Sequence, residues 1–323
     1  MASGQECRGA MPIKLETLTW TELVALDRDR TVIIFPVSPL EEHGPHLPIG
    51  TDMYTAMAGA EGAAAVLERR RPDITVLIAP VLPIGSNTVP YFPGIGVHPR
   101  FVRHMAIRSG VAMAREGFRY IALVSGHLGP SHLAALEEAA EYVSRRYHIT
   151  MIAPVAPTMH LTLHGRFLEQ FAKELESPLT QEEIQAIISD DHAGALETSI
   201  MLHLHPGLVK GTYRELPPVT VRDLLRWKGW LRPRWSGYLG DPAHSRSDVG
   251  AAASKVLAEV SADLVLRAMD GEDIMAGLRT GSRWPLWLIW RSDFRRNMKM
   301  TAAGFAAALT GMAIWRASRR SHA

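Results

Sequence analysis

The sequence has almost no cysteine, little net charge and no long apolar run near its start. Cys7 is the single cysteine among 323 residues, which excludes a disulfide framework and a thiolate metal site and fits a reducing compartment. A net charge of +2 is too small to suggest nucleic-acid binding, and no domain-wide basic face is visible in the sequence. The opening MASGQECRGAMPIK lacks the apolar core of a signal peptide, so we expect a cytoplasmic protein.

Several catalytic signatures are also missing. There is no HExxH, no GxSxG and no Walker pattern, so the zincin, serine-hydrolase and P-loop classes lack their motifs. The content of 47% apolar and 21% charged residues is that of an ordinary globular protein.

What the chain does contain is an alternation of short apolar runs with helical patterns. The runs are nearly continuous, as in strands buried on both faces of a parallel sheet, and they cover residues 31–37, 74–82, 119–125 and 148–155. Helices are expected at 56–70, 99–116 and 131–147, and later at 166–176, 180–188 and 248–269. This order predicts an α/β fold, a three-layer α/β/α sandwich with a mainly parallel sheet.

The chain is expected to divide into three parts. Residues 1–12 read as a disordered lead, residues 13–269 as one catalytic domain, and residues 270–323 as a C-terminal extension. In folds of this kind the chemistry lies at the carboxyl ends of the strands, and polar residues gather after the predicted strands.

The first polar group is EEHGPHLP followed by an aspartate, with Glu41, His43 and Asp52 as the candidate ligands. Two carboxylates and an imidazole in a loop shaped by glycine and proline suit zinc, manganese or iron. A carboxylate such as Asp52 can bridge two ions, and two close ions can share one activated water.

Two further segments carry histidines. The turn SGHLGP places His127 between a strand and a helix, and DDHAGALETS places His192 before a helix that carries Glu197. Any one of these histidines alone would more often be a surface or core residue. Three such segments at the predicted sheet edges favour a common site instead.

Four motifs together resemble one family. PVSPLEEHGPHLPIGTD, GSNTVPYFPG, SGHLGPS and HAGALETSIML occur in the order typical of the creatininase (creatinine amidohydrolase) family, over roughly residues 13–265. The resemblance implies an α/β/α sandwich that assembles as a homohexamer. It also implies hydrolysis of a C–N bond, as in creatinine ring opening, formamide cleavage or the trimming of a redox-cofactor peptide.

The resemblance also implies roles for particular residues. Glu41 and His127 would hold one divalent ion, His43 the other, and Asp52 would bridge the two. His192 matches a catalytic histidine that passes a proton to the leaving nitrogen. Creatininase proper has a glutamate where this chain has Gly129, as in the Gly-Gly branch of the family, so Glu197 is the candidate to complete the second ion's ligands and to assist catalysis.

The chain departs from the family pattern around these ligands. Ser125, Leu128 and Pro130 replace two asparagines and a glycine of the turn, and Val89 replaces a histidine. Residues 156–190 contain no tryptophan, whereas creatininase packs creatinine against tryptophans. These differences argue against creatinine as the substrate and keep open a non-catalytic binding or scaffold role.

The C-terminal extension combines tryptophans with arginines. WPLWLIW at 284–290 and a basic patch precede sixteen uncharged residues at 300–315, fewer than the roughly 20 apolar residues that a membrane span needs. The tail is therefore expected either to contact a membrane surface, as part of a membrane-associated peptidase, or to pack on a neighbouring subunit.

Overall fold

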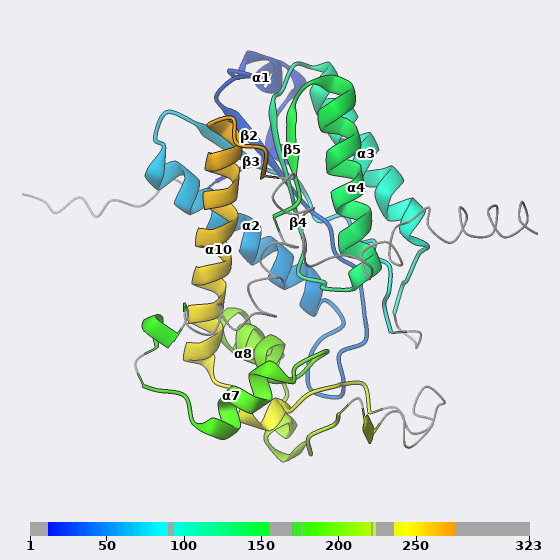
Figure 1. Cartoon of the computed structure of the whole chain (residues 1–323), viewed down its shortest axis with the longest axis vertical. Helices are drawn as coiled ribbons and strands as arrows, with labels where there is room; N and C mark the ends of the chain where they lie inside the picture. Colours follow the sequence, from blue (N-terminus) through cyan, green and yellow to red (C-terminus); the bar gives the residue numbers. More distant parts are fainter. Residues whose placement is uncertain are drawn as a thin grey trace, which may run out of the picture.

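The computed structural model describes residues 12–89, 94–154, 170, 172–175, 177–220, 222–223 and 236–274. Within them the centre is a five-stranded sheet in the order β1-β3-β2-β4-β5, with every pairing parallel (Figure 1). The strands are β1 Ile13–Lys14, β2 Thr31–Pro36, β3 Thr75–Ile78, β4 Tyr120–Val124 and β5 Thr150–Ile152. The parallel sheet predicted from the apolar runs is confirmed.

Helices cover both faces of this sheet. The principal helices are α1 Trp20–Ala25, α2 Thr51–Arg70, α3 Pro99–Arg115, α4 Pro130–Tyr147, α7 Gln181–Ile188, α8 Ala195–Leu204 and α10 Ser247–Met269. Alternate β2 residues explain the two layers: Val32 and Ile34 pack with residues of α2 and α10, whereas Ile33 and Phe35 pack with residues of α3 and α4. This is the expected α/β/α sandwich, because successive strand side chains point to opposite faces.

Several element boundaries differ from the predictions. Helix α2 begins at Thr51, five residues before the predicted start at 56, and so includes Asp52. The two-residue strand β1 is too short to leave an alternating pattern. Most of the predicted helix over 166–176 lies outside the described residues, and within it residues Ala172–Glu174 form a 3-10 helix.

The strand order reverses direction between β2 and β4, so the carboxyl ends of these two strands form the switch point of the sheet. The chain passes from β2 through α2 to β3 on one side, and then through α3 to β4 on the other side of β2. Loops that leave neighbouring strands in opposite directions open a crevice between them, where ligands of such sheets bind. The loops that follow β2 and β4 are those that carry Glu41, His43 and His127.

Neither end of the chain can be compared fully with its prediction. The lead at 1–11 and nearly all of the extension, from 275 onward, lie outside the described residues, and so do the tryptophan-rich and uncharged segments of the tail. None of the helices in the described part of the chain has the length and apolar character needed to cross a membrane.

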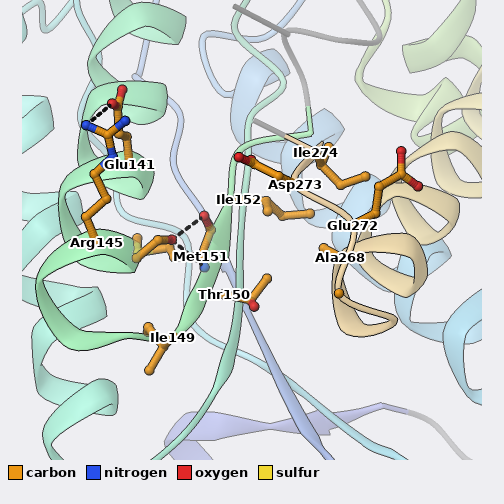
Figure 2. Close-up of a pocket in the computed structure, with 12 residues that line it drawn as sticks. Glu141, Arg145, Ile149, Thr150, Met151, Ile152, Ala268, Glu272, Asp273 and Ile274 are labelled. Carbon is orange, nitrogen blue, oxygen red and sulfur yellow. Dashed lines mark hydrogen bonds and ion pairs between the residues drawn. The ribbon is translucent and has the colours of Figure 1, made fainter. Parts of the chain in front are cut away.

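The outer edge of β5 borders a separate cavity of about 320 Å³ between α4 and the end of α10 (Figure 2). Thr150 donates its N–H to Arg119 on the β4 side, so Met151 turns its backbone groups to the other edge. There the Ser144 hydroxyl accepts from the Met151 N–H at 2.9 Å and donates to the Met151 C=O at 3.0 Å. Since exposed sheet edges invite unwanted pairing, Ser144 protects this edge.

Candidate metal centre

The loop after β2 and the start of α2 supply three buried groups. Glu41, His43 and Asp52 are each 1% exposed. The N–H of Glu41 donates to the Ile49 C=O at 3.0 Å, which closes the loop so that it leads directly into α2. Asp52 lies in the first turn of that helix, where the helix dipole favours a negative charge.

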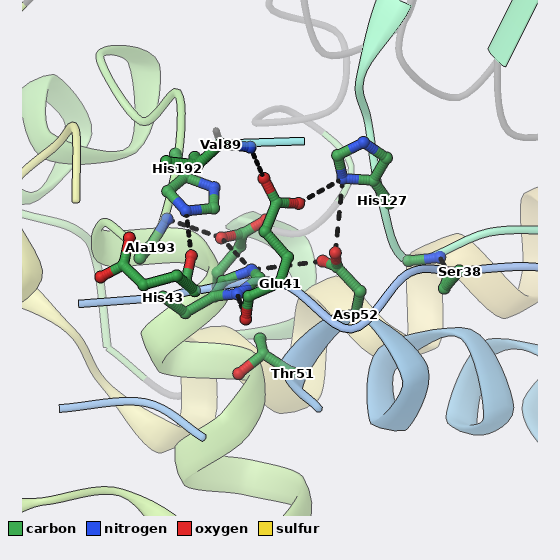
Figure 3. Close-up of polar contacts among 12 residues, drawn as sticks. Ser38, Glu41, His43, Thr51, Asp52, Val89, His127, His192 and Ala193 are labelled. Atoms are coloured by element: carbon green, nitrogen blue, oxygen red, sulfur yellow. Dashed lines mark hydrogen bonds and ion pairs between the residues drawn. The ribbon is translucent and has the colours of Figure 1, made fainter. Parts of the chain in front are cut away.

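The turn after β4 brings His127 against two of these carboxylates (Figure 3). Its Nδ1 lies 3.0 Å from Glu41 Oε2 and 3.3 Å from Asp52 Oδ2. Oxygen and nitrogen atoms from three separate segments therefore converge on one buried point, and together they could hold a metal ion.

A second group of ligand atoms adjoins the first through Asp52. The Nε2 of His43 lies 3.2 Å from Asp52 Oδ1 and 3.6 Å from Glu197 Oε2. The rings of His43 and His192 are 4.4 Å apart, and His43, His192 and Glu197 form a second set that could hold a metal ion. Asp52 thus presents one carboxylate oxygen to each set.

Each of the three histidines has its other ring nitrogen on a backbone carbonyl. His43 Nδ1 is 3.1 Å from Glu41 O, His127 Nε2 is 3.0 Å from Ser86 O, and His192 Nε2 is 2.6 Å from Glu42 O. A carbonyl can only accept, so these nitrogens carry protons. The remaining nitrogens can offer a lone pair to a metal ion that displaces their protons, which is how metal-binding histidines are usually held.

The electrostatics of the centre favour a cation. Burial by itself would lower the pKa of His43, but the nearby carboxylates of Asp52, Glu197 and Glu41 outweigh it and raise that pKa to about 10. His127 shows the same balance, and Asp52 and Glu41 hold its pKa well above the ordinary value. Within the described residues, Glu41 Oε2, His43 Nε2 and Asp52 Oδ2 are buried and meet polar atoms of the centre as ion pairs, without a well-directed hydrogen bond. Divalent ions would satisfy these atoms, so the donor set fits them.

The structure brings together all six residues named from the sequence: Glu41, His43, Asp52, His127, His192 and Glu197. Their individual roles stay predictions. The geometry adds one alternative, because His192 lies within the second ligand set, whereas the sequence suggested only a proton-transfer role.

A family model described as creatininase, creatinine amidohydrolase, matches residues 16–265. The chain belongs to the creatininase family. It is 26% identical over 240 residues to a mycofactocin precursor peptide peptidase of Mycobacterium tuberculosis strain CDC 1551, covering 68% of this chain and 78% of that protein. The corresponding peptidase of Mycolicibacterium smegmatis is 27% identical over 250 residues, covering 75% and 85%. A solved structure described as creatininase Mn superposes with a TM-score of 0.58 at 20% identity, covering 80% of this chain and 99% of that one.

Membership in the creatininase family identifies the chain as an amidohydrolase of that family. The structure shows what the residues that depart from the family pattern contact. At the position of the usual histidine, Val89 donates its backbone N–H to Glu41 Oε1 (Figure 3). The Ser125 hydroxyl contacts the backbone of His127. Leu128 stands where the family has a glycine. It is 41% exposed and places an apolar side chain at the surface of the turn.

The sequence reasoning gave no role to three groups around the site. His46 and His132 are both fully buried, and burial lowers the pKa of His46 to about 4 and of His132 to about 3. Asp190 accepts from the N–H groups of Gly194 and Leu196 at 3.0 and 2.5 Å and so caps the start of α8. These three side chains contact groups that the fold brings near them, so no motif or spacing in the sequence identifies them.

Proposed function

We propose that this chain is a two-metal hydrolase that cleaves the C–N bond of a small amide, a formamide or a short peptide. One ion would be held by Glu41, Asp52 and His127, and the other by His43, Asp52 and Glu197. The observation that supports this most directly is Asp52, whose two oxygens lie 3.2 Å from His43 Nε2 and 3.3 Å from His127 Nδ1. Zinc, manganese and iron all suit such nitrogen and oxygen ligands.

Bound ions would lower the pKa of a shared water and polarise the carbonyl of the substrate. The chain's own residues have separate tasks. The carboxylates of Glu41 and Asp52 place negative charge at the centre, and Glu197 is held toward it by the Ala193 N–H, at 2.6 Å. His192 keeps its Nδ1 lone pair free because its Nε2–H donates to the Glu42 carbonyl. In this proposal His192 Nδ1 takes up the proton released by the attacking water and passes it to the leaving nitrogen.

Among the possible substrates, a short peptide is favoured by the relatives. Two mycobacterial proteins that match most of this chain are described as peptidases of a precursor peptide. The creatininase structures share the fold at about 20% identity and therefore do not argue for creatinine. Small formamides and cyclic amides remain alternatives.

The decisive experiment measures metal content and hydrolysis in the same samples. Wild-type protein is expected to hold two ions per chain and to hydrolyse short peptides or formamides with added zinc, manganese or iron. Asp52→Ala should lose most metal and all activity. Glu61→Ala, on the same helix but pairing with Lys14 at the surface, should lose neither. An Asp52→Ala protein that retains metal and activity would refute the proposal, and fewer than one ion per wild-type chain would favour a binding or scaffold role.

The role of His192 can be tested separately. If it transfers a proton, His192→Gln should keep two ions per chain while kcat falls by roughly a hundredfold or more. If it is a ligand of the second ion, the same variant should lose about one ion per chain. Metal analysis and kinetics on one preparation distinguish the two.

A further inference from the structure

A further buried histidine, His132, packs against His127 of the metal centre and takes no part in the chemistry proposed above. It belongs to the first turn of α4 and is fully buried. Its ring meets that of His127 edge to face, with the centroids 5.2 Å apart and the planes at 72°. A residue in this position can affect how the His127 ring is directed.

The hydrogen bonds of His132 all pass through one nitrogen. Its Nε2 lies 3.2 Å from the Val37 carbonyl and 3.2 Å from Ser125 Oγ. Because a carbonyl oxygen only accepts, Nε2 carries the proton, and the Val37 carbonyl and Ser125 Oγ share it in a three-centre hydrogen bond. The other nitrogen, Nδ1, is buried and has no hydrogen-bond partner among the residues that the structure describes. A buried polar atom without a partner costs free energy, and the hydrogen bonds at Nε2 offset that cost.

The hydroxyl that His132 contacts holds the backbone of His127 at both ends. Ser125 Oγ accepts from the His127 N–H at 3.0 Å and donates to the His127 C=O at 2.9 Å. It also lies 3.2 Å from Ser38 Oγ, which in turn accepts from the Gly126 N–H at 2.9 Å. The turn that presents His127 is thus tied to the end of β2 and to the first turn of α4.

We propose that His132 is a positioning residue for His127. It holds the Ser125 hydroxyl by a hydrogen bond, and its ring packs against the His127 imidazole. His127 Nδ1 thereby stays directed at Glu41 and Asp52. The inference rests on the proposed function, because it assigns His127 an ion to bind. Groups that orient metal ligands typically change metal affinity ten- to a hundredfold when they are removed.

The experiment measures zinc affinity by competition with a chelator, together with the thermal midpoint, in full-length protein. His132→Leu removes the donor and is expected to weaken the binding of one of the two zinc ions ten- to a hundredfold. His132→Gln can donate through its side-chain amide and should restore most of that affinity. Ser144→Ala is the matched control, because it removes two hydrogen bonds from the same helix, to the Met151 backbone, and should leave both zinc affinities unchanged.

The outcomes separate this inference from the proposed function. Two zinc ions bound with wild-type affinity in His132→Leu would overturn the positioning role alone, as would an equal loss of zinc affinity in Ser144→Ala. A wild-type chain that binds no zinc, manganese or iron would overturn both proposals. If His132→Leu does not fold, Ser125→Ala carries the test, since it breaks the link while His132 stays. Ser125→Ala should weaken the binding of one zinc ion at least tenfold. Wild-type zinc affinity in this variant would refute the positioning role of His132.

Discussion

Gly129 offers the sharpest test of how the turn after β4 builds its half of the centre. A Cβ at this position would lie 2.4 Å from His127 Nε2 and 2.9 Å from the Ser86 carbonyl, the two groups joined by the hydrogen bond that fixes the His127 proton. The backbone itself would accept alanine, because φ is −54° and ψ is 122°. Gly129→Ala therefore acts on His127 rather than on the chain's own conformation.

The magnitude follows from what the extra methyl displaces. Losing the His127–Ser86 hydrogen bond costs about 0.5–1.5 kcal/mol, and forcing a methyl into filled space costs about 1–3 kcal/mol. If roughly 1.4–2.8 kcal/mol of this cost is lost from zinc binding because His127 Nδ1 is turned away, zinc affinity at the Glu41–Asp52–His127 set should fall ten- to a hundredfold.

The assay is a zinc titration against a chelator, with urea denaturation to measure the free energy of unfolding. Gly207→Ala serves as the control, since a Cβ there meets nothing within 4 Å, and it should bind zinc as the wild type does. Gly129→Ala with wild-type zinc affinity and wild-type stability would show that His127 does not depend on this contact.

Three other predictions follow from single contacts. Ala193 has φ +51°, a left-handed conformation that costs alanine roughly 1 kcal/mol, but its methyl is fully buried and contributes about 0.8 kcal/mol, so Ala193→Gly should change the free energy of unfolding by less than about 1 kcal/mol in urea titrations. A Cβ on Gly250 would lie 1.9 Å from the Ser199 carbonyl of α8, so Gly250→Ala should lower stability by about 1–3 kcal/mol and loosen the ion nearest α8, which metal analysis would detect. Burial lowers the pKa of His46 to about 4, so below pH 6.5 the unfolded chain takes up a proton that the folded chain refuses. Metal-depleted protein should then lose up to about 1.4 kcal/mol of stability per pH unit from this group between pH 6.5 and 4, and His46→Gln should lose that part of the slope.

The sheet could be predicted because its strands are buried on both faces. The run at 31–37 reads as continuous apolar sequence, and all six residues of β2 are buried. The boundaries were harder to predict, and the start of α2 shows why. Thr51 and Asp52 are buried polar residues in the first turn of α2, and apolar periodicity cannot mark a turn whose buried side chains are polar.

The centre could be predicted in part for a related reason. Glu41, His43 and Asp52 lie close together in the sequence, and their approach to His127 could be predicted because both segments follow predicted strands of a parallel sheet. The arrangement of protons could not be predicted, because it depends on carbonyls of Glu41, Glu42 and Ser86 that any sequence would supply. The same holds for His132, whose partners Val37 and Ser125 become its neighbours only when β2 and β4 pair.

The contact at Gly129 also explains how the second ion's ligands are distributed in the proposed site. Creatininase proper places a glutamate at this position, but here any side chain would collide with His127 as it is held by Ser86. The turn after β4 can therefore supply one ligand, and the missing carboxylate has to come from another element. Glu197 on α8 is in that place, with Oε2 3.6 Å from His43 Nε2. The second ion then depends on the packing of α8 against α10, whereas the first depends on the loops after β2 and β4 and on the first turn of α2. Destabilising the α8–α10 contact should accordingly release one ion before the other.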